Sequence, residues 1–294
     1  MKHEKRLLLV PAVISLLAVL ALVVWGLKPG IDLTGGSLLQ VSYAGAVPTV
    51  AQIQDATAKL NVGEIRIQPT GQSGYTLTER ALSNEEKNSL EQALQTLGPI
   101  HEDEFTSVSP TIGQELLNKG LIALALVAAC IILFIAFAFR KVSKPVASWK
   151  YGVIAIITLV HDILIPTGLF ALLGHFEGAE VNSLFIVALL TLLGVSINNT
   201  IVVFDRIREN LGAGAKKETF DETISRSIMQ TLARSINTSL AVIIVLIALY
   251  ILGPASTQVL ALTLIVGMIA GTYSSIFLAS PLLVAWEKWS ASTR

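Results

Sequence analysis

The stretch SLFIVALLTLLGVSINNTIVVF, residues 183–204, decides the fold because it is long, apolar and without a charged residue. An α-helix needs about 20 predominantly apolar residues to cross the hydrocarbon core of a membrane. The composition of the whole chain agrees, since 53% of its residues are hydrophobic and 14% are charged, whereas a soluble domain carries about 25% charged residues. The segment therefore predicts a membrane-spanning helix in an integral membrane protein.

Five further segments reach the same length and apolarity. The six predicted spans are residues 7–27, 121–139, 151–173, 183–204, 236–252 and 258–286. The first could be mistaken for a signal peptide, but its apolar core is longer than the usual run of about 7–15 residues and no small-residue cleavage site follows. We therefore expect an uncleaved signal anchor at residues 1–27 and five more spans within residues 119–294.

Lys and Arg are distributed unevenly between the predicted links, which indicates the orientation in the membrane. The links at residues 175–180 and 253–257 contain neither residue. The basic residues gather elsewhere: Lys2, Lys5 and Arg6; Arg140, Lys141, Lys144 and Lys150; Arg206, Arg208, Lys216, Lys217 and Arg226; Lys288 and Arg294. Both termini are therefore expected on the cytoplasmic side of the inner membrane, with residues 28–118 outside.

Residues 28–118 form the sizeable polar segment, and their pattern predicts an α+β domain. Strand-like patterns occur at residues 37–43, 64–70, 74–80 and 100–108. Apolar residues recur at helical spacing over 49–60, and Ser83 with Glu86 has the pattern of a capping box, which begins a helix that runs to Leu97. The resulting order, β-α-β-β-α-β, is that of a ferredoxin-like unit. We expect a membrane all-α six-helix bundle with one external ferredoxin-like α+β domain.

Sequence motifs of several enzyme classes are missing. The glycine-containing segment at residues 212–216 lacks the spacing of a phosphate-binding P-loop, and H-E-x-x-H, C-x-x-C and G-x-S-x-G do not occur. The net charge of zero gives no reason to expect a nucleic-acid partner, and the single cysteine, Cys130, cannot form an internal disulfide. We therefore expect a chain embedded in membrane lipid that is not an enzyme and binds no cofactor, metal or nucleic acid.

Polar residues inside the predicted spans are the candidate functional residues, because each is costly in hydrocarbon and usually faces the interior of a bundle. Three groups stand out, in the third span, the fourth span and at the start of the fifth: His161 and Asp162; Asn198, Asn199 and Thr200; Arg234 with Asn237 and Thr238. An arginine and a carboxylate in one bundle favour ion pairing, and a titratable group beside them can carry protons.

A structural explanation stands beside the functional one for each group. Asn and Thr side chains in membrane helices often serve only to hydrogen-bond neighbouring helices. Arg234 can extend its charged end to the membrane surface, and His161 with Asp162 can form a neutral packed pair. Gly267 and Gly271 have the G-x-x-x-G spacing that lets two helices approach closely, so we assign them a structural role.

Motifs spread over the whole chain resemble those of the SecF family of bacterial protein-export subunits. The first is Gly30-Ile-Asp32-Leu-Thr-Gly35-Gly36, similar to the family pattern G-x-D-F-x-G-G, from which Leu33 departs. The others are VSPTIGQEL at 108–116, His161-Asp162, SINNT at 196–200, FDRIREN at 204–210 with Asp205, Arg206 and Arg208, RSINTS at 234–239 and GTYSSIFLASP at 271–281. Their order and spacing over six spans make the resemblance specific.

The resemblance implies half of an RND-superfamily transporter that pairs with SecD. The pair draws exported preproteins through the SecYEG channel, coupled to proton flow. The family's proton path uses a carboxylate in the fourth span and the arginine that opens the fifth. Arg234 supplies the arginine, but Asn199 stands where the family has Asp, and an amide does not titrate. Proton transfer in this chain then has to use Asp162, His161 or a carboxylate of SecD.

Three functions remain open from the sequence. The first is a SecF-like accessory subunit of proton-gradient-driven export. The second is a non-conducting structural or assembly subunit of the same complex, which Asn199 favours. The third is an RND-type exporter of small molecules or lipids, which the compact polar segment at 28–118 disfavours because it leaves little wall for a substrate pocket.

Overall fold

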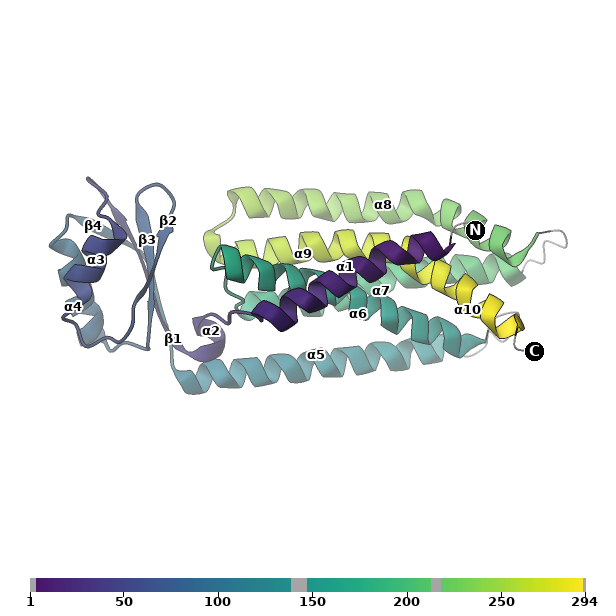
Figure 1. Ribbon diagram of the computed structural model, residues 1–294, viewed down its shortest axis with the longest axis horizontal. Helices are drawn as coiled ribbons and strands as arrows, with labels where there is room; N and C mark the ends of the chain where they lie inside the picture. Colours follow the sequence, from purple (N-terminus) through teal and green to yellow (C-terminus); the bar gives the residue numbers. More distant parts are fainter. Residues whose placement is uncertain (1–3, 139–146, 213–217, 293–294) are drawn as a thin grey trace. The chain divides into compact units, whose positions relative to one another are not determined.

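The computed structural model describes residues 4–138, 147–212 and 218–292, and the chain divides into two compact units (Figure 1). The first, which we call the helical unit, combines Met1–Lys28 with Leu121–Arg294, and the second, the sheet unit, is Pro29–Gly120. Several of the basic residues used to predict the orientation lie outside the described residues: Lys2, Arg140, Lys141, Lys144, Lys216, Lys217 and Arg294.

Within the described residues, six helices are long and apolar enough to cross a membrane, which confirms the predicted number of spans. They are α1 (Glu4–Trp25), α5 (Pro110–Ala138), α6 (Ser148–Phe176), α7 (Ser183–Gly212), α8 (Phe220–Leu252) and a last one made of α9 (Ala255–Ser274), the π-helical turn η1 (Ser275–Ala279) and α10 (Ser280–Ser292). Helix α8 begins well before the predicted residue 236, because a capping box of Thr219 and Glu222 starts it in a polar segment. The chain is a multi-pass membrane protein.

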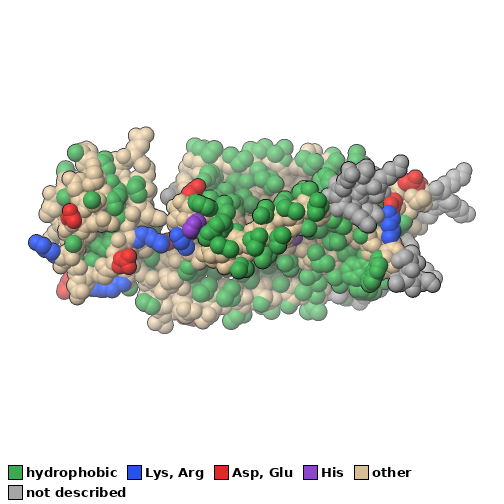
Figure 2. All heavy atoms as spheres, viewed as in Figure 1, with side chains coloured by type: hydrophobic (Ala, Val, Ile, Leu, Met, Phe, Trp, Pro, Cys, Tyr) green, Lys and Arg blue, Asp and Glu red, His purple; other side chains and the backbone are tan. Residues whose placement is uncertain are grey.

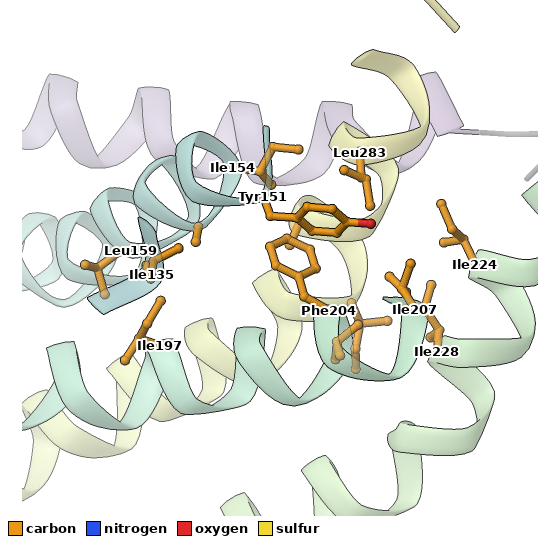
Figure 3. Close-up of a cluster of buried hydrophobic side chains, with 14 of the residues drawn as sticks. Ile135, Tyr151, Ile154, Leu159, Ile197, Phe204, Ile207, Ile224, Ile228 and Leu283 are labelled. Carbon is orange, nitrogen blue, oxygen red and sulfur yellow. The ribbon is translucent and has the colours of Figure 1, made fainter. Parts of the chain in front are cut away.

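The spans of the helical unit pack around α9. Helices α6, α7 and α8 each contact α9, and α1 lies along α6. An apolar core fills the junction of α6, α7, α10 and the first turns of α8, where the rings of Tyr151 and Phe204 meet edge to face with centroids 5.2 Å apart (Figure 3). At Gly267 an added Cβ would lie 2.2 Å from Leu192 Cδ1, so this glycine lets α9 approach α7 closely. The outer surface of the bundle is also largely apolar (Figure 2).

The sheet unit contains a four-stranded sheet and two helices. Strands and helices alternate along the chain in the predicted order, β-α-β-β-α-β. The elements are β1 (Gly36–Tyr43), α3 (Val50–Thr57), β2 (Arg66–Thr70), β3 (Gly74–Glu79), α4 (Asn84–Gln95) and β4 (Ile100–Val108). The strands lie in the order β2-β3-β1-β4, and each neighbouring pair is antiparallel. Capping boxes begin both helices, at Thr49 with Gln52 and at Ser83 with Glu86.

Alternation along β1 and β3 gives the sheet one apolar face, because successive side chains of a strand point to opposite sides. Leu39 and Val41 on β1 and Leu77 on β3 are buried on this face. They pack with Ile53, Leu90 and Leu94 from the two helices. The sheet unit therefore has its own apolar core.

A short helix, α2 (Ile31–Thr34), precedes β1 and is absent from the sequence-based prediction. Gly35 and Gly36 connect it to the sheet with φ angles of 81° and 143°. A Cβ on Gly35 would lie 2.4 Å from Pro110 Cα, and a Cβ on Gly36 would lie 2.7 Å from the Glu79 carbonyl oxygen. Both positions require glycine, because the backbone conformation and the close contacts exclude a side chain.

Candidate functional site

Asp162 is the one fully buried carboxylate among the described residues of the helical unit, with 0% of its surface exposed. It lies on α6 where α7 and α9 approach. Ser196 on α7 donates a hydrogen bond to its Oδ2 atom, and Ser274 near the end of α9 also hydrogen-bonds the carboxylate. A Cβ on Gly271 would lie 3.4 Å from Asp162 Oδ2, so α9 passes directly beside the carboxylate. The carboxylate thus joins three helices, while Oδ1 has no hydrogen-bond partner in the described part of the chain.

His161 contacts a different helix, because consecutive helical residues point about 100° apart. Its Nδ1 atom lies 2.6 Å from Ser15 Oγ on α1, and its Nε2 atom is buried without a partner among residues the structure describes. Gly168 lets α1 come this close, since an added Cβ would lie 2.6 Å from Ala18 Cα. His161 and Asp162 therefore connect α6 to different neighbours.

The three polar residues of the fourth span divide between two sides of α7. Asn199 and Thr200 are buried, whereas Asn198 is exposed. Asn199 lies one helical turn beyond Ser196 and so on the same side of α7. Its carboxamide makes no hydrogen bond to any described residue. Position 199 thus lies close to the Asp162–Ser196 contact along α7, with a side chain that does not titrate.

Arg234 is exposed on α8, as are Asn237 and Thr238. Within residues 4–138, 147–212 and 218–292 its guanidinium forms no ion pair or hydrogen bond. The structure therefore does not pair Arg234 with Asp162 or Asn199, so of the two possibilities that the sequence left open, ion pairing within the bundle is the one it does not show among the described residues. Its counter-charge has to lie outside the described residues, or its charged end has to reach the membrane surface.

The motif residues at the end of the fourth span connect two helices beyond the apolar run. Asp205 and Arg208 form an ion pair at 3.2 Å on the surface of α7. Arg206 donates a hydrogen bond to Gln230 Oε1 on α8 at 2.7 Å, and the buried Asn210 donates to the same oxygen at 2.8 Å. Arg206 and Asn210 therefore hold the end of α7 against α8, which is a structural role.

The remaining motif residues lie in the sheet unit, with Asp32 in the first turn of α2 and Gly35 and Gly36 at the turn described above. Sequence reasoning missed the hydroxyl groups around the His161-Asp162 pair. Ser196 and Ser274 stand inside motifs quoted above, so their positions carried a signal. Ser15 carried none, because a lone serine in an apolar helix is common.

Comparison with known proteins places these motifs in a family. A family model described as "Protein export membrane protein SecD/SecF, C-terminal" matches residues 89–289, and one for the SecD/SecF GG motif matches residues 21–47. The protein translocase subunit SecF of Thermobaculum terrenum is 42% identical, and the match covers 96% of this chain and 89% of that protein. The subunit of the same name from Synechocystis is 33% identical over 98% of this chain and 94% of its own. Both are named as translocase subunits rather than as enzymes.

Two solved structures of SecDF share the architecture. The crystal structure of SecDF from Thermus thermophilus, described as a translocon-associated membrane protein, matches with a TM-score of 0.84 and 31% identity over 97% of this chain and 38% of the SecDF chain. A SecDF structure in a super-membrane-facing form matches with a TM-score of 0.71 and 30% identity over 100% of this chain and 39% of its own. This chain therefore spans well under half the length of the SecDF chains it matches.

Proposed function

This chain belongs to the SecD/SecF family of protein-export membrane proteins, as a translocase subunit of the SecF type, and we propose that it pairs with a SecD-type chain to drive preprotein export through SecYEG with a proton gradient. One observation carries the proposal. Almost the whole of this chain matches 38% of a SecDF chain, whose name joins both subunits. We infer that the remaining part of the SecDF chain corresponds to the SecD-type partner, which would be a separate chain here.

The exposed arginine on α8 supports a partner inside the membrane. A charged side chain is costly within the hydrocarbon of a membrane, so charges there are usually paired. Arg234 has no counter-charge among the described residues, and Asn237 and Thr238 are exposed beside it. We assign this face of α8 to the contact with the SecD-type chain, which would contribute a carboxylate opposite Arg234.

Asp162 is the group of this chain that we assign to proton transfer, in place of Asn199. Its carboxylate is buried between α6, α7 and α9 and hydrogen-bonds serine hydroxyls of the two neighbours. Because a negative charge in this position is stabilised only by those hydroxyls, gain or loss of a proton changes how the three helices pack. The membrane potential contributes about 2.3 kcal/mol per charge for each 100 mV, which is enough to bias such a change.

We further propose that residues 28–118 form an external ferredoxin-like domain, with both termini on the cytoplasmic side of the inner membrane. The antiparallel strand order β2-β3-β1-β4 with two helices on one face supports the fold assignment. Cysteines at Ser83 and Glu209, in a Cys130→Ala background, should react with an impermeant thiol reagent from opposite sides. Reaction from the same side would overturn this orientation.

A non-conducting structural subunit is the second candidate, and Asn199 favours it. In that case the chain would hold the SecD-type partner in place, and export would depend on its presence but not on its titratable groups. The third possibility, an exporter of small molecules or lipids, gains nothing from the relatives, which are named translocase subunits.

The decisive experiment is preprotein export into vesicles that contain SecYEG, this chain and its SecD-type partner, with and without a proton gradient. We expect Asp162→Asn to reduce export to the level without a gradient, and the exposed Asp55→Asn of the sheet unit to leave it unchanged. Export that needs the chain but ignores the gradient would establish the structural role. If Asn199→Asp increases gradient-dependent export and Asp162→Asn does not reduce it, the proton site has to be assigned to the fourth span instead.

A further inference from the structure

Glu79 occupies a core position of the sheet unit. It ends β3, where Tyr75, Leu77 and Glu79 alternate on the buried side of the strand. Tyr75 and Leu77 belong to the apolar core, and Glu79 is only 5% exposed. A carboxylate at such a position is unusual, because Glu is rarely buried in water-soluble structure unless it is paired.

The carboxylate of Glu79 lacks a partner in the described part of the chain. Neither oxygen atom accepts a hydrogen bond from any residue that the structure describes. Arg80, the neighbouring cation in sequence, is engaged elsewhere: it pairs with Glu86 and donates to the Asn61 carbonyl oxygen at 2.7 Å. Opposite Glu79 on β1 lies Ser37, whose hydroxyl accepts from the Leu82 amide at 2.8 Å. The group is therefore buried without a compensating charge or donor.

The surroundings of Glu79 offer no charge that would keep it ionised. Strand β1 presents Ser37, which also shares a hydrogen bond of 2.8 Å with Ser107 of β4. Helix α2 presents the apolar side chain of Ile31 beside Gly36. Arg80, in the segment after β3, is the charged group nearest along the chain, and its guanidinium is held by Glu86. Burial is accordingly the one cause that raises the pKa of Glu79, to about 8.

The same residue touches the turn that links the sheet to α2. A Cβ on Gly36 would lie 2.7 Å from the Glu79 carbonyl oxygen and 2.9 Å from Ile31 Cγ2. The backbone of Glu79 is thus in close contact with the Gly35-Gly36 turn. A shift of the end of β3 toward water, which an ionised carboxylate requires, would open this contact.

We propose that Glu79 is a proton-binding site of the sheet unit, occupied in the folded state, and that release of its proton loosens the end of β3 from the Gly35-Gly36 turn. This site is separate from Asp162 and does not depend on the function proposed above. If residues 28–118 lie on the external, periplasmic side of the membrane, as proposed, the site responds to the proton concentration on that side.

The sign of the pH dependence follows from the raised pKa. An unfolded or opened chain releases the proton near the ordinary value of 4.5, whereas the folded unit holds it up to about 8. The bound proton stabilises the folded sheet unit fully at pH values below the lower pKa. This stabilisation falls as the pH rises from the lower pKa to the upper one, and it changes little at pH values above the upper pKa. Each pH unit in this window changes the opening equilibrium by up to about tenfold.

Hydrogen exchange of the full chain in detergent, followed by mass spectrometry, tests the proposal. Protection of segments 35–42 and 74–82 is measured at about pH 6 and about pH 8, after correction for the intrinsic exchange rate. We expect protection in the unmodified chain to fall at least about tenfold between these values. In Glu79→Gln, which is neutral and of similar shape, protection should not change with pH.

The matched control is Glu104→Gln, which removes an exposed carboxylate from β4 and should behave like the unmodified chain. Glu79→Leu is the second variant, in case the glutamine amide itself disturbs the core, and its protection should also be independent of pH. Equal protection at both pH values in the unmodified chain would overturn the proposal. So would a fall in both Glu79 variants as large as in the unmodified chain.

Discussion

The sheet unit and the helical unit place polar and apolar side chains in opposite ways. In the sheet unit, Leu39 and Leu77 are fully buried and charged residues such as Glu104 lie at the surface. In the helical unit, Val245 is 67% exposed while Asp162 is fully buried. The difference follows from the surroundings, because water favours a polar surface and lipid an apolar one.

Because of this contrast, a buried carboxylate has different surroundings in the two units. In the helical unit the interior is more polar than the lipid outside, and Asp162 finds serine hydroxyls there. In the sheet unit the interior is less polar than the water outside, and Glu79 finds no donor. A buried acid is expected in the first unit and is the exception in the second, which is why burial alone raises the pKa of Glu79.

The largest expected effect comes from placing one charge on the surface of each unit. Val245→Lys puts an ammonium group on the exposed face of α8, which should cost about 2.5–3.5 kcal/mol in the membrane. Val47→Lys makes the same change at an exposed position of the sheet unit and should alter stability by less than about 0.5 kcal/mol. The stability of Val245→Lys is measured by the recovery of folded chain from the membrane fraction and by the thermal midpoint of tryptophan fluorescence. The stability of Val47→Lys is measured by hydrogen exchange of residues 36–57.

If Val245→Lys and Val47→Lys destabilise their units equally, the two surfaces have the same surroundings, and the contrast between the helical unit and the sheet unit fails. The fluorescence signal is specific, because the four tryptophans, Trp25, Trp149, Trp286 and Trp289, all belong to the helical unit. Unfolding of the sheet unit therefore leaves this signal nearly unchanged.

A smaller effect tests the packing of the turn before β1. Gly35→Ala places a Cβ 2.4 Å from Pro110 Cα at a φ of 81°, whereas Gly71→Ala has a similar φ of 64° with nothing within 4 Å. Gly35 also has a ψ of 158°, a backbone conformation that essentially only glycine adopts, so the difference between the two variants reports this strain together with the contact with Pro110. We expect Gly35→Ala to destabilise the sheet unit by about 1–3 kcal/mol more than Gly71→Ala, as measured by hydrogen exchange. Equal losses would show that the turn can move away from Pro110.

The elements that the sequence predicts well are those with a repeated signal. Long apolar runs predict all six spans because lipid requires them, and alternation with a capping box at Ser83 predicts the order of the strands and helices. The four residues of α2 are too few to show a period. The start of α8 was placed too late because its capping box at Thr219 lies in a polar segment, outside the apolar run.

The candidate site was predictable only in part. A histidine and an aspartate inside an apolar run stand out in any sequence, so His161 and Asp162 were selected as candidates. Their partners were not, because Ser15 is 146 residues from His161 along the chain and no pattern tells which helices pack together. The exposed position of Arg234 could not be decided from the sequence for a related reason, since a helix in lipid can be apolar on every side and its periodicity then does not reveal the inner face.

The smallest effect compares the two capping boxes, one in each unit. Ser83 accepts from the Glu86 amide at 3.3 Å, and Thr219 accepts from the Glu222 amide at 3.4 Å, so the two hydrogen bonds are nearly equal. Ser83→Ala should destabilise the start of α4 by about 1 kcal/mol. Thr219→Ala should have the same effect at the start of α8 if this end of the helix lies in water.

The comparison of these two losses measures where the membrane ends along α8. In water, solvent replaces the lost hydroxyl and the cost stays near 1 kcal/mol, whereas in hydrocarbon an amide without a partner costs several kcal/mol. Hydrogen exchange of residues 83–90 and 219–226 gives both values in one sample of each variant. Equal losses agree with a helix that starts outside the membrane, some turns before Arg234. A loss for Thr219→Ala that exceeds the loss for Ser83→Ala by several kcal/mol would place the start of α8 in lipid, and the contrast between the units would then extend to residue 219.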